Sequence, residues 1–116
     1  MRGLIASFGY AVAGLGVMFL RERNGRIHLA LALLAVLAGA ALGVTRAVWL
    51  WIVLAIALVW ITEAVNSAIE TLCDTLHPAR VEGIRRTKDV AAAAVLVAAV
   101  AAAVIGGLVF WPYVFG

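Results

Sequence analysis

Charged residues and cysteine are scarce in this sequence, and both shortages limit the class of protein that it can be. Only 13% of the 116 residues are charged, which is about half the fraction found in soluble domains. The mean hydropathy of +1.13 arises from long apolar blocks, which indicate an integral membrane protein. Cys73 is the single cysteine, so an intrachain disulfide is excluded and we interpret this residue as a small packing side chain.

The usual motifs of soluble nucleotide-binding and zinc proteins are also missing. No G-x-x-x-x-G-K-[ST] segment occurs, and one cysteine with two histidines offers no tetrahedral zinc spacing. The net charge of +3 does not indicate a nucleic-acid partner, because the basic residues flank apolar segments instead of forming a groove with interleaved aromatics. Any nucleotide site in this chain must therefore be built by membrane helices.

Three apolar segments predict membrane spans over about residues 27–44, 47–76 and 89–111, within a single domain of residues 1–116. The first has 18 residues, or about 27 Å of helix, which crosses a hydrocarbon core. The apolar run of the second ends at Ile61, so that helix must continue through polar residues and end before Pro78. We expect a polar loop over residues 77–88, and close helix packing at the small-residue pair Gly39 and Gly43.

The segment from about residue 2 to 21 is apolar but interrupted by four glycines. It is compatible with a signal-peptide core, a further span, or a helix on the membrane surface. No small-residue cleavage site follows it, because the next residues are the polar run 21–26. We therefore favour a surface helix.

The basic residues give an orientation for three spans. Eight of them flank the ends that residues 2–26 and 77–88 would share, and Arg46 alone lies on the opposite side. The eight are Arg2, Arg21, Arg23, Arg26, Arg80, Arg85, Arg86 and Lys88. By the excess of Lys and Arg on cytoplasmic loops, the shared side is predicted to be cytoplasmic.

Acidic residues gather at this same level. Glu63, Asn66, Glu70 and Asp74 fall within an arc of roughly 80° on one helix, and acids at a membrane edge are costly and usually functional. Glu22, Lys88 and Asp89 come to that level from two other segments. Carboxylates suit Mg²⁺, lysine neutralises phosphate, and a further carboxylate can accept a hydroxyl proton. This set of groups is typical of phosphoryl transfer.

These residues resemble the small prokaryotic diacylglycerol kinase family, which includes undecaprenol kinases. The main signature is E-x-x-N-[ST]-A-[IL]-E-x-x-x-D over residues 63–74, and supporting segments are E-x-N-x-R-I-H over 22–28 and a K-D pair at 88–89. The resemblance implies a homotrimer of three-span protomers with an N-terminal surface helix in the bacterial plasma membrane. It implies transfer of the γ-phosphate of MgATP to a lipid hydroxyl at the cytoplasmic interface, turning diacylglycerol into phosphatidic acid or undecaprenol into undecaprenyl phosphate.

The resemblance also implies a role for each residue. Glu63 would accept the proton of the lipid hydroxyl. Glu22 and Glu70 would hold the divalent metal. Contacts to ATP would come from Lys88, Asp89 and Tyr10, and Asn66 and Asp74 would support the site.

Other interpretations remain open from the residues themselves. The acidic face could be a solvated helix end, and Asp89 could cap the following helix. His28 and His77 are interpreted as membrane-interface residues. A proton- or cation-coupled transporter is an alternative function, although its acids would lie near the bilayer midplane. A non-enzymatic assembly subunit, with the cluster as a docking face, is another.

Overall fold

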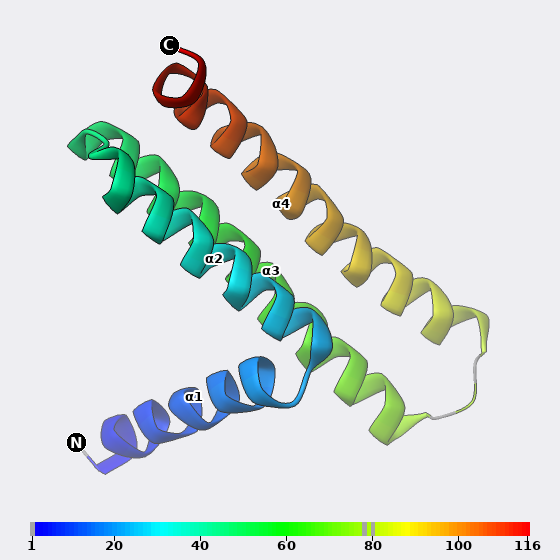
Figure 1. Ribbon diagram of the computed structural model, residues 1–116. Coiled ribbons are helices and arrows are strands. Elements are labelled where there is room, and N and C mark those ends of the chain that lie inside the picture. The colour runs from blue at the N-terminus through cyan, green and yellow to red at the C-terminus, as the bar shows by residue number, and fades with distance from the viewer. Residues whose placement is uncertain (1, 78, 80) are drawn as a thin grey trace.

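The computed structural model describes residues 2–77, 79 and 81–116, and this part of the chain forms four helices (Figure 1). They are α1 (Arg2–Leu20), α2 (Arg23–Leu42), α3 (Arg46–Leu76) and α4 (Glu82–Phe115). The predicted all-helical membrane class is confirmed, since each of the four is long and apolar enough to cross a membrane. Length and composition therefore do not separate α1 from the three predicted spans.

Helices α2, α3 and α4 lie side by side and alternate in direction, whereas α1 turns away from them where α2 begins (Figure 1). The start of α2, the last turns of α3 and the start of α4 consequently lie toward the same end of the bundle (Figure 1). Six of the eight basic residues considered above lie there or at the adjoining corner between α1 and α2, with described side chains: Arg21, Arg23, Arg26, Arg85, Arg86 and Lys88. Arg46 begins α3 at the opposite end, and Arg80 lies outside the described residues.

The core is a narrow stripe along α3. Its buried positions recur at intervals of three, four or seven residues, as expected for one helix face packed on neighbours. They are Ile52, Ala55, Val59, Glu63, Asn66 and Cys73. Small residues face this stripe, Ala32 from α2 and Ala91 and Ala98 from α4, which permits close helix approach. Most large apolar side chains remain exposed, as suits a surface covered by lipid or further copies.

The turn between α2 and α3 gives the two predicted packing glycines different roles. Gly39 is buried against the indole of Trp49, where a Cβ would meet the ring at 2.8 Å. Gly43 instead ends α2 in the left-handed conformation, at φ 63°, which glycine adopts without strain. Thr45 then caps α3 by accepting a hydrogen bond from the Val48 amide.

The expected polar loop over residues 77–88 is wrong in its second half. Helix α3 ends at Leu76 as predicted, but α4 begins at Glu82, and Val81 occupies the N-cap position that we considered for Asp89. Ion pairs one helical turn apart stabilise this polar start, because Arg85 contacts both Glu82 and Asp89. The polar composition of residues 82–88 favours a loop, but the spacing of their charges supports a helix.

A tight corner between α1 and α2 sets the position of Glu22. A Cβ at Gly25 would collide with the Met18 carbonyl, so the two helices approach as closely as glycine allows. Phe19 packs edge-on against Trp60 of α3, with ring centroids 4.8 Å apart. These contacts fix the end of α1 and the start of α2 against the polar half of α3.

Candidate active site

Glu63 is the centre of the polar cluster. It is 3% exposed on the buried stripe of α3, and its Oε2 lies 3.5 Å from Nε2 of His28 on α2. Within the described residues, Oε2 is buried without a hydrogen-bond partner. An unsatisfied buried carboxylate oxygen costs stability, so its retention points to function.

Glu22 reaches α3 through a side-chain hydrogen bond. It occupies the N-cap position of α2 but does not cap that helix. Instead, both of its carboxylate oxygens lie 2.5 Å from Oγ of Ser67, whose hydroxyl donates to the carboxylate. Because Ser67 lies one turn beyond Glu63 and one turn before Glu70, this bond holds Glu22 between the two other carboxylates.

Asn66 and Glu70 form the next layer of the cluster. The Asn66 side chain is buried, and its Nδ2 donates to Oε1 of Glu70 at 3.4 Å. Its Oδ1 is buried without a hydrogen-bond partner in the described structure. Glu70 itself is partly exposed. The amide nitrogen of Asn66 therefore donates to Glu70, and its amide oxygen remains available as an acceptor in the interior.

Glu63 interacts electrostatically with His28, Glu22 and Glu70. Three like charges are thus gathered around one point, and gathering them is unfavourable unless a cation or proton compensates. No group of three or more His, Cys, Asp or Glu side chains among the described residues has metal-binding geometry. A protein usually supplies one or two carboxylates to a Mg²⁺ ion that also binds phosphate oxygens. Glu22 and Glu70 are the two carboxylates that interact with Glu63.

The remaining predicted site residues lie at the edge of the cluster or beyond it. Asp74 is 62% exposed, and its Oδ1 binds Nζ of Lys88 on α4 at 2.8 Å, so this pair ties α4 to the end of α3. Asp89 is paired with Arg85 at 2.8 Å. Tyr10 is 77% exposed on α1. The shared face predicted for α3 therefore runs from buried Glu63 to exposed Asp74.

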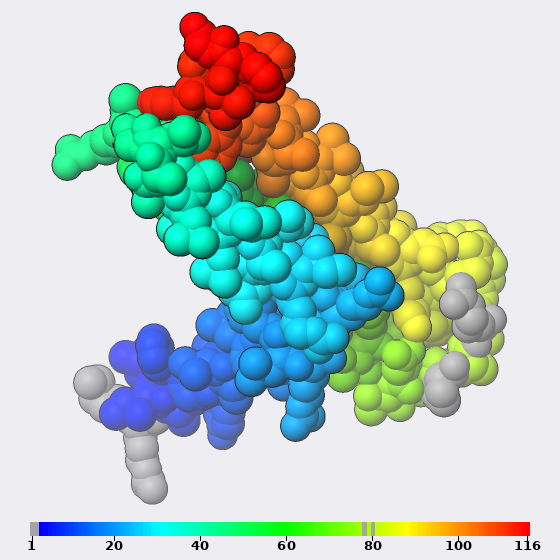
Figure 2. Space-filling view, viewed as in Figure 1, coloured from blue at the N-terminus to red at the C-terminus, as the bar shows by residue number. Residues whose placement is uncertain are grey.

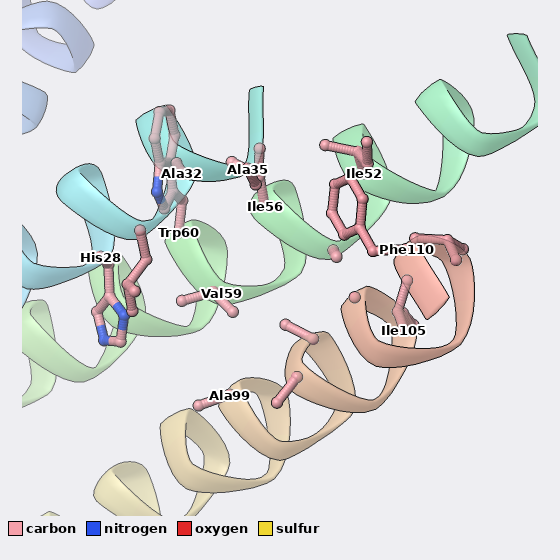
Figure 3. Close-up of a pocket in the computed structure, with 16 residues that line it drawn as sticks. His28, Ala32, Ala35, Ile52, Ile56, Val59, Trp60, Ala99, Ile105 and Phe110 are labelled. Carbon is pink, nitrogen blue, oxygen red and sulfur yellow. The ribbon is translucent and has the colours of Figure 1, made fainter. Parts of the chain in front are cut away.

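Beside the cluster lies a cavity of about 270 Å³ lined by residues of α2, α3 and α4. The space-filling view shows a hollow between α2 and α4, with α3 at its floor (Figure 2). The close-up shows His28 at one end of the cavity and Ile52 and Phe110 toward the other (Figure 3). All the lining side chains except that of His28 are apolar, many of them alanines.

The sequence patterns did not predict the contacts of two residues in this cluster, His28 and Ser67. His28 was interpreted as a membrane-interface residue, yet its side chain is only 15% exposed and faces Glu63. Ser67 is only the [ST] position of the signature, yet in the structure it bonds Glu22 across 45 positions of sequence. Its spacing from Glu63 and Glu70, one turn each way, was the available signal.

We predict that Ser67→Ala loosens the corner between α1 and α2. Losing a hydrogen bond to a charged acceptor should cost about 1.5–3 kcal/mol of unfolding free energy, and amide hydrogen exchange over residues 21–26 should rise. Thermal unfolding in detergent and exchange mass spectrometry measure the two effects. Ser7→Ala, at the exposed serine of α1, is the matched control. Unchanged exchange over residues 21–26 would contradict the role given to this bond.

Comparison with known proteins places these residues in a family. Residues 9–110 match the family described as prokaryotic diacylglycerol kinase. The chain is 36% identical to a diacylglycerol kinase of Synechocystis sp. over 94% of its own length and 63% of that protein's length. It is 31% identical to the diacylglycerol kinase of Escherichia coli strain K12, over 95% of this chain and 90% of that protein. It is 33% identical to the undecaprenol kinase of Bacillus subtilis strain 168, over 91% of this chain and 86% of that protein. The chain belongs to the prokaryotic diacylglycerol kinase family, a family of lipid kinases.

Proposed function

We propose that the protein transfers the γ-phosphate of ATP to the hydroxyl of a membrane lipid, with Glu63 as the proton acceptor. The observation that carries this proposal is a buried carboxylate with an unpartnered oxygen, set among Glu22, Glu70 and His28. Lipid alcohols are the acceptors named by the relatives, as diacylglycerol and undecaprenol. For this chain, either alcohol is the proposed substrate.

In the proposed reaction, Glu63 takes the proton of the lipid hydroxyl while that oxygen bonds to the γ-phosphorus. The bond from the γ-phosphorus to the β–γ bridging oxygen breaks, and ADP leaves. A base within hydrogen-bond reach of the attacking hydroxyl contributes about 10²- to 10⁴-fold to such a step. Products are ADP and the lipid phosphate, and the proton held by Glu63 passes to solvent.

Glu22 and Glu70 would hold Mg²⁺ in this proposal. A bound Mg²⁺ supplies neutralisation of phosphate charge. Ser67 fixes the Glu22 carboxylate and Asn66 donates to Glu70, so both carboxylates are oriented before the ion arrives. Lys88, Asp89 and Tyr10 are the proposed ATP contacts. Asp74 supports that assignment by holding Lys88 at the cluster's edge.

We further propose three spans formed by α2, α3 and α4, with α1 on the membrane surface and the cluster on the cytoplasmic side. The bend of α1 away from the other helices supports this arrangement (Figure 1), as does the gathering of basic residues at the cluster's end of the bundle. The exposed apolar side chains would be covered by lipid and by two further copies in a homotrimer. A transporter or an assembly subunit has no support from the family match.

A direct assay tests the proposed function. The purified protein is incubated with γ-labelled ATP, Mg²⁺ and vesicles that contain diacylglycerol or undecaprenol, and lipid products are separated by chromatography. Labelled phosphatidic acid or undecaprenyl phosphate supports the proposal, and the faster product identifies the preferred alcohol. If the protein shows a cooperative thermal unfolding transition, and is therefore folded, but forms neither product, the proposed function is overturned.

We predict that Glu70→Gln lowers lipid phosphorylation by about 100-fold, since an oriented charge at the transferring phosphate is lost. The Mg²⁺ concentration for half-maximal turnover should rise, and Mn²⁺ binding followed by electron paramagnetic resonance should weaken. Glu82→Gln is the matched control, because Glu82 is exposed and paired with arginines of its own helix. Unchanged Mn²⁺ binding by the Glu70 variant would remove that residue from the metal site.

A further inference from the structure

We propose that His28 is a positioning residue for Glu63, holding Oε2 so that the other carboxylate oxygen faces the lipid hydroxyl. This inference rests on the proposed function of Glu63 as the proton acceptor. Its starting point is the pairing of the two side chains across helices: Nε2 of His28 on α2 lies 3.5 Å from Oε2 of Glu63 on α3.

The contact with His28 involves Oε2 of Glu63, the carboxylate oxygen that lacks a hydrogen-bond partner in the described part of the chain. Oε2 is buried and makes no hydrogen bond within the described residues, and His28 Nε2 is the ring nitrogen that faces it. With the proton on Nε2, a neutral imidazole donates toward Oε2. Bonds between a catalytic group and its orienting partner are often long without substrate and shorten when substrate binds. A modest rotation of either side chain would close 3.5 Å to hydrogen-bond distance.

The surroundings of His28 favour this role over a general interaction with solvent. The imidazole forms the end wall of the cavity between α2, α3 and α4 (Figure 3), whose other lining residues are apolar. Its side chain is 15% exposed. Water therefore competes little for the ring, and a hydrogen bond formed in such a setting is stronger than at the surface.

Other groups near Glu63 do not supply the same contact. Glu22 and Glu70 are like charges that repel its carboxylate. Ser67 is committed to Glu22, and Nδ2 of Asn66 to Glu70. Among the described residues of the cluster, His28 is thus the donor placed against Glu63. A base oriented by a third group is a recurrent arrangement in enzymes.

The test separates hydrogen bonding by His28 from packing. His28→Ala should lower kcat for lipid phosphorylation by about 10- to 100-fold, with KM for ATP within about 2-fold of the original. His28→Gln, whose amide nitrogen can occupy the position of Nε2, should recover most of kcat, whereas the shorter His28→Asn should not. His77→Ala is the matched control, since His77 is exposed at the end of α3 and should leave kcat unchanged.

A second measurement does not depend on turnover. In ¹⁵N-labelled protein, Glu63→Gln should shift the Nε2 resonance of His28 and leave that of His77 in place. Full activity of the Ala variant, equal loss in the Ala and Gln variants, or an unmoved His28 resonance would each overturn the inference. If Glu63→Gln itself remains fully active, the proposed function fails, while a shifted His28 resonance would still establish the contact.

Discussion

Glu63→Gln should abolish most lipid phosphorylation, with a loss of about 10²- to 10⁴-fold in turnover. The amide has nearly the shape of the carboxylate but cannot accept the hydroxyl proton as a base. Glu63 is buried beside His28, Glu22 and Glu70, so removing its charge also relieves repulsion within the cluster. We therefore expect the fold and the proposed trimer to persist while the chemistry is lost.

Labelled ATP with vesicle-embedded lipid measures turnover, and size-exclusion chromatography in detergent measures the oligomeric state of the original protein and of the variant. Glu82→Gln provides the same acid-to-amide change at an exposed position. The Glu63 variant should bind a fluorescent ATP analogue as well as the original protein does. Near-normal phosphorylation by this variant would exclude Glu63 as the base.

Asn66→Leu should inactivate the enzyme without weakening its fold. The amide is buried with an unpartnered Oδ1, and its Nδ2 makes one 3.4 Å bond to Glu70. Leucine has a similar size and places no polar atom in the interior. An unsatisfied buried acceptor costs about 1–3 kcal/mol of unfolding free energy, so its removal should offset the loss of the bond to Glu70. Turnover should fall about 100-fold, because Glu70 loses its orienting donor.

Thermal unfolding in detergent, followed together with the lipid kinase assay, checks both parts of this expectation. Asn24→Leu is the control, at the exposed asparagine in the first turn of α2. A midpoint for Asn66→Leu equal to or above that of the original protein, with turnover lost, is the expected pattern. A parallel fall in midpoint and activity would show that Asn66 serves the fold instead. Such opposition between stability and activity is common where polar groups are buried for function.

The α3 face illustrates how far periodicity alone could go. The helical repeat placed Glu63, Asn66, Glu70 and Asp74 on one side of the helix. The short apolar run and Pro78, and not the repeat, predicted that α3 continues to Leu76. The repeat could not rank the burial of the four polar residues, which falls from Glu63 to exposed Asp74. Burial depends on which neighbouring helix covers each face, because Cys73 is buried while the adjacent Asp74 is exposed.

The polar start of α4 shows where composition alone misleads. Its composition favoured a loop, but the spacing of Glu82, Arg85 and Asp89 supports ion pairs along a helix. Composition records how polar a segment is, whereas the pairing that stabilises a polar helix depends on intervals of three and four residues. The same intervals, applied to the stretch 82–89, would have extended the helix.

The sequence by itself determined the membrane class, the all-helical fold, the acidic face of α3 and the family. These follow from local hydropathy and from motifs that lie within single segments. Only the tertiary structure brought Glu22 to Ser67 and His28 to Glu63. Those contacts join residues 45 and 35 positions apart, and they depend on the close corner at Gly25 and on the packing of α2 against α3. Pairing between helices is decided by that packing geometry, which no periodicity within one helix records.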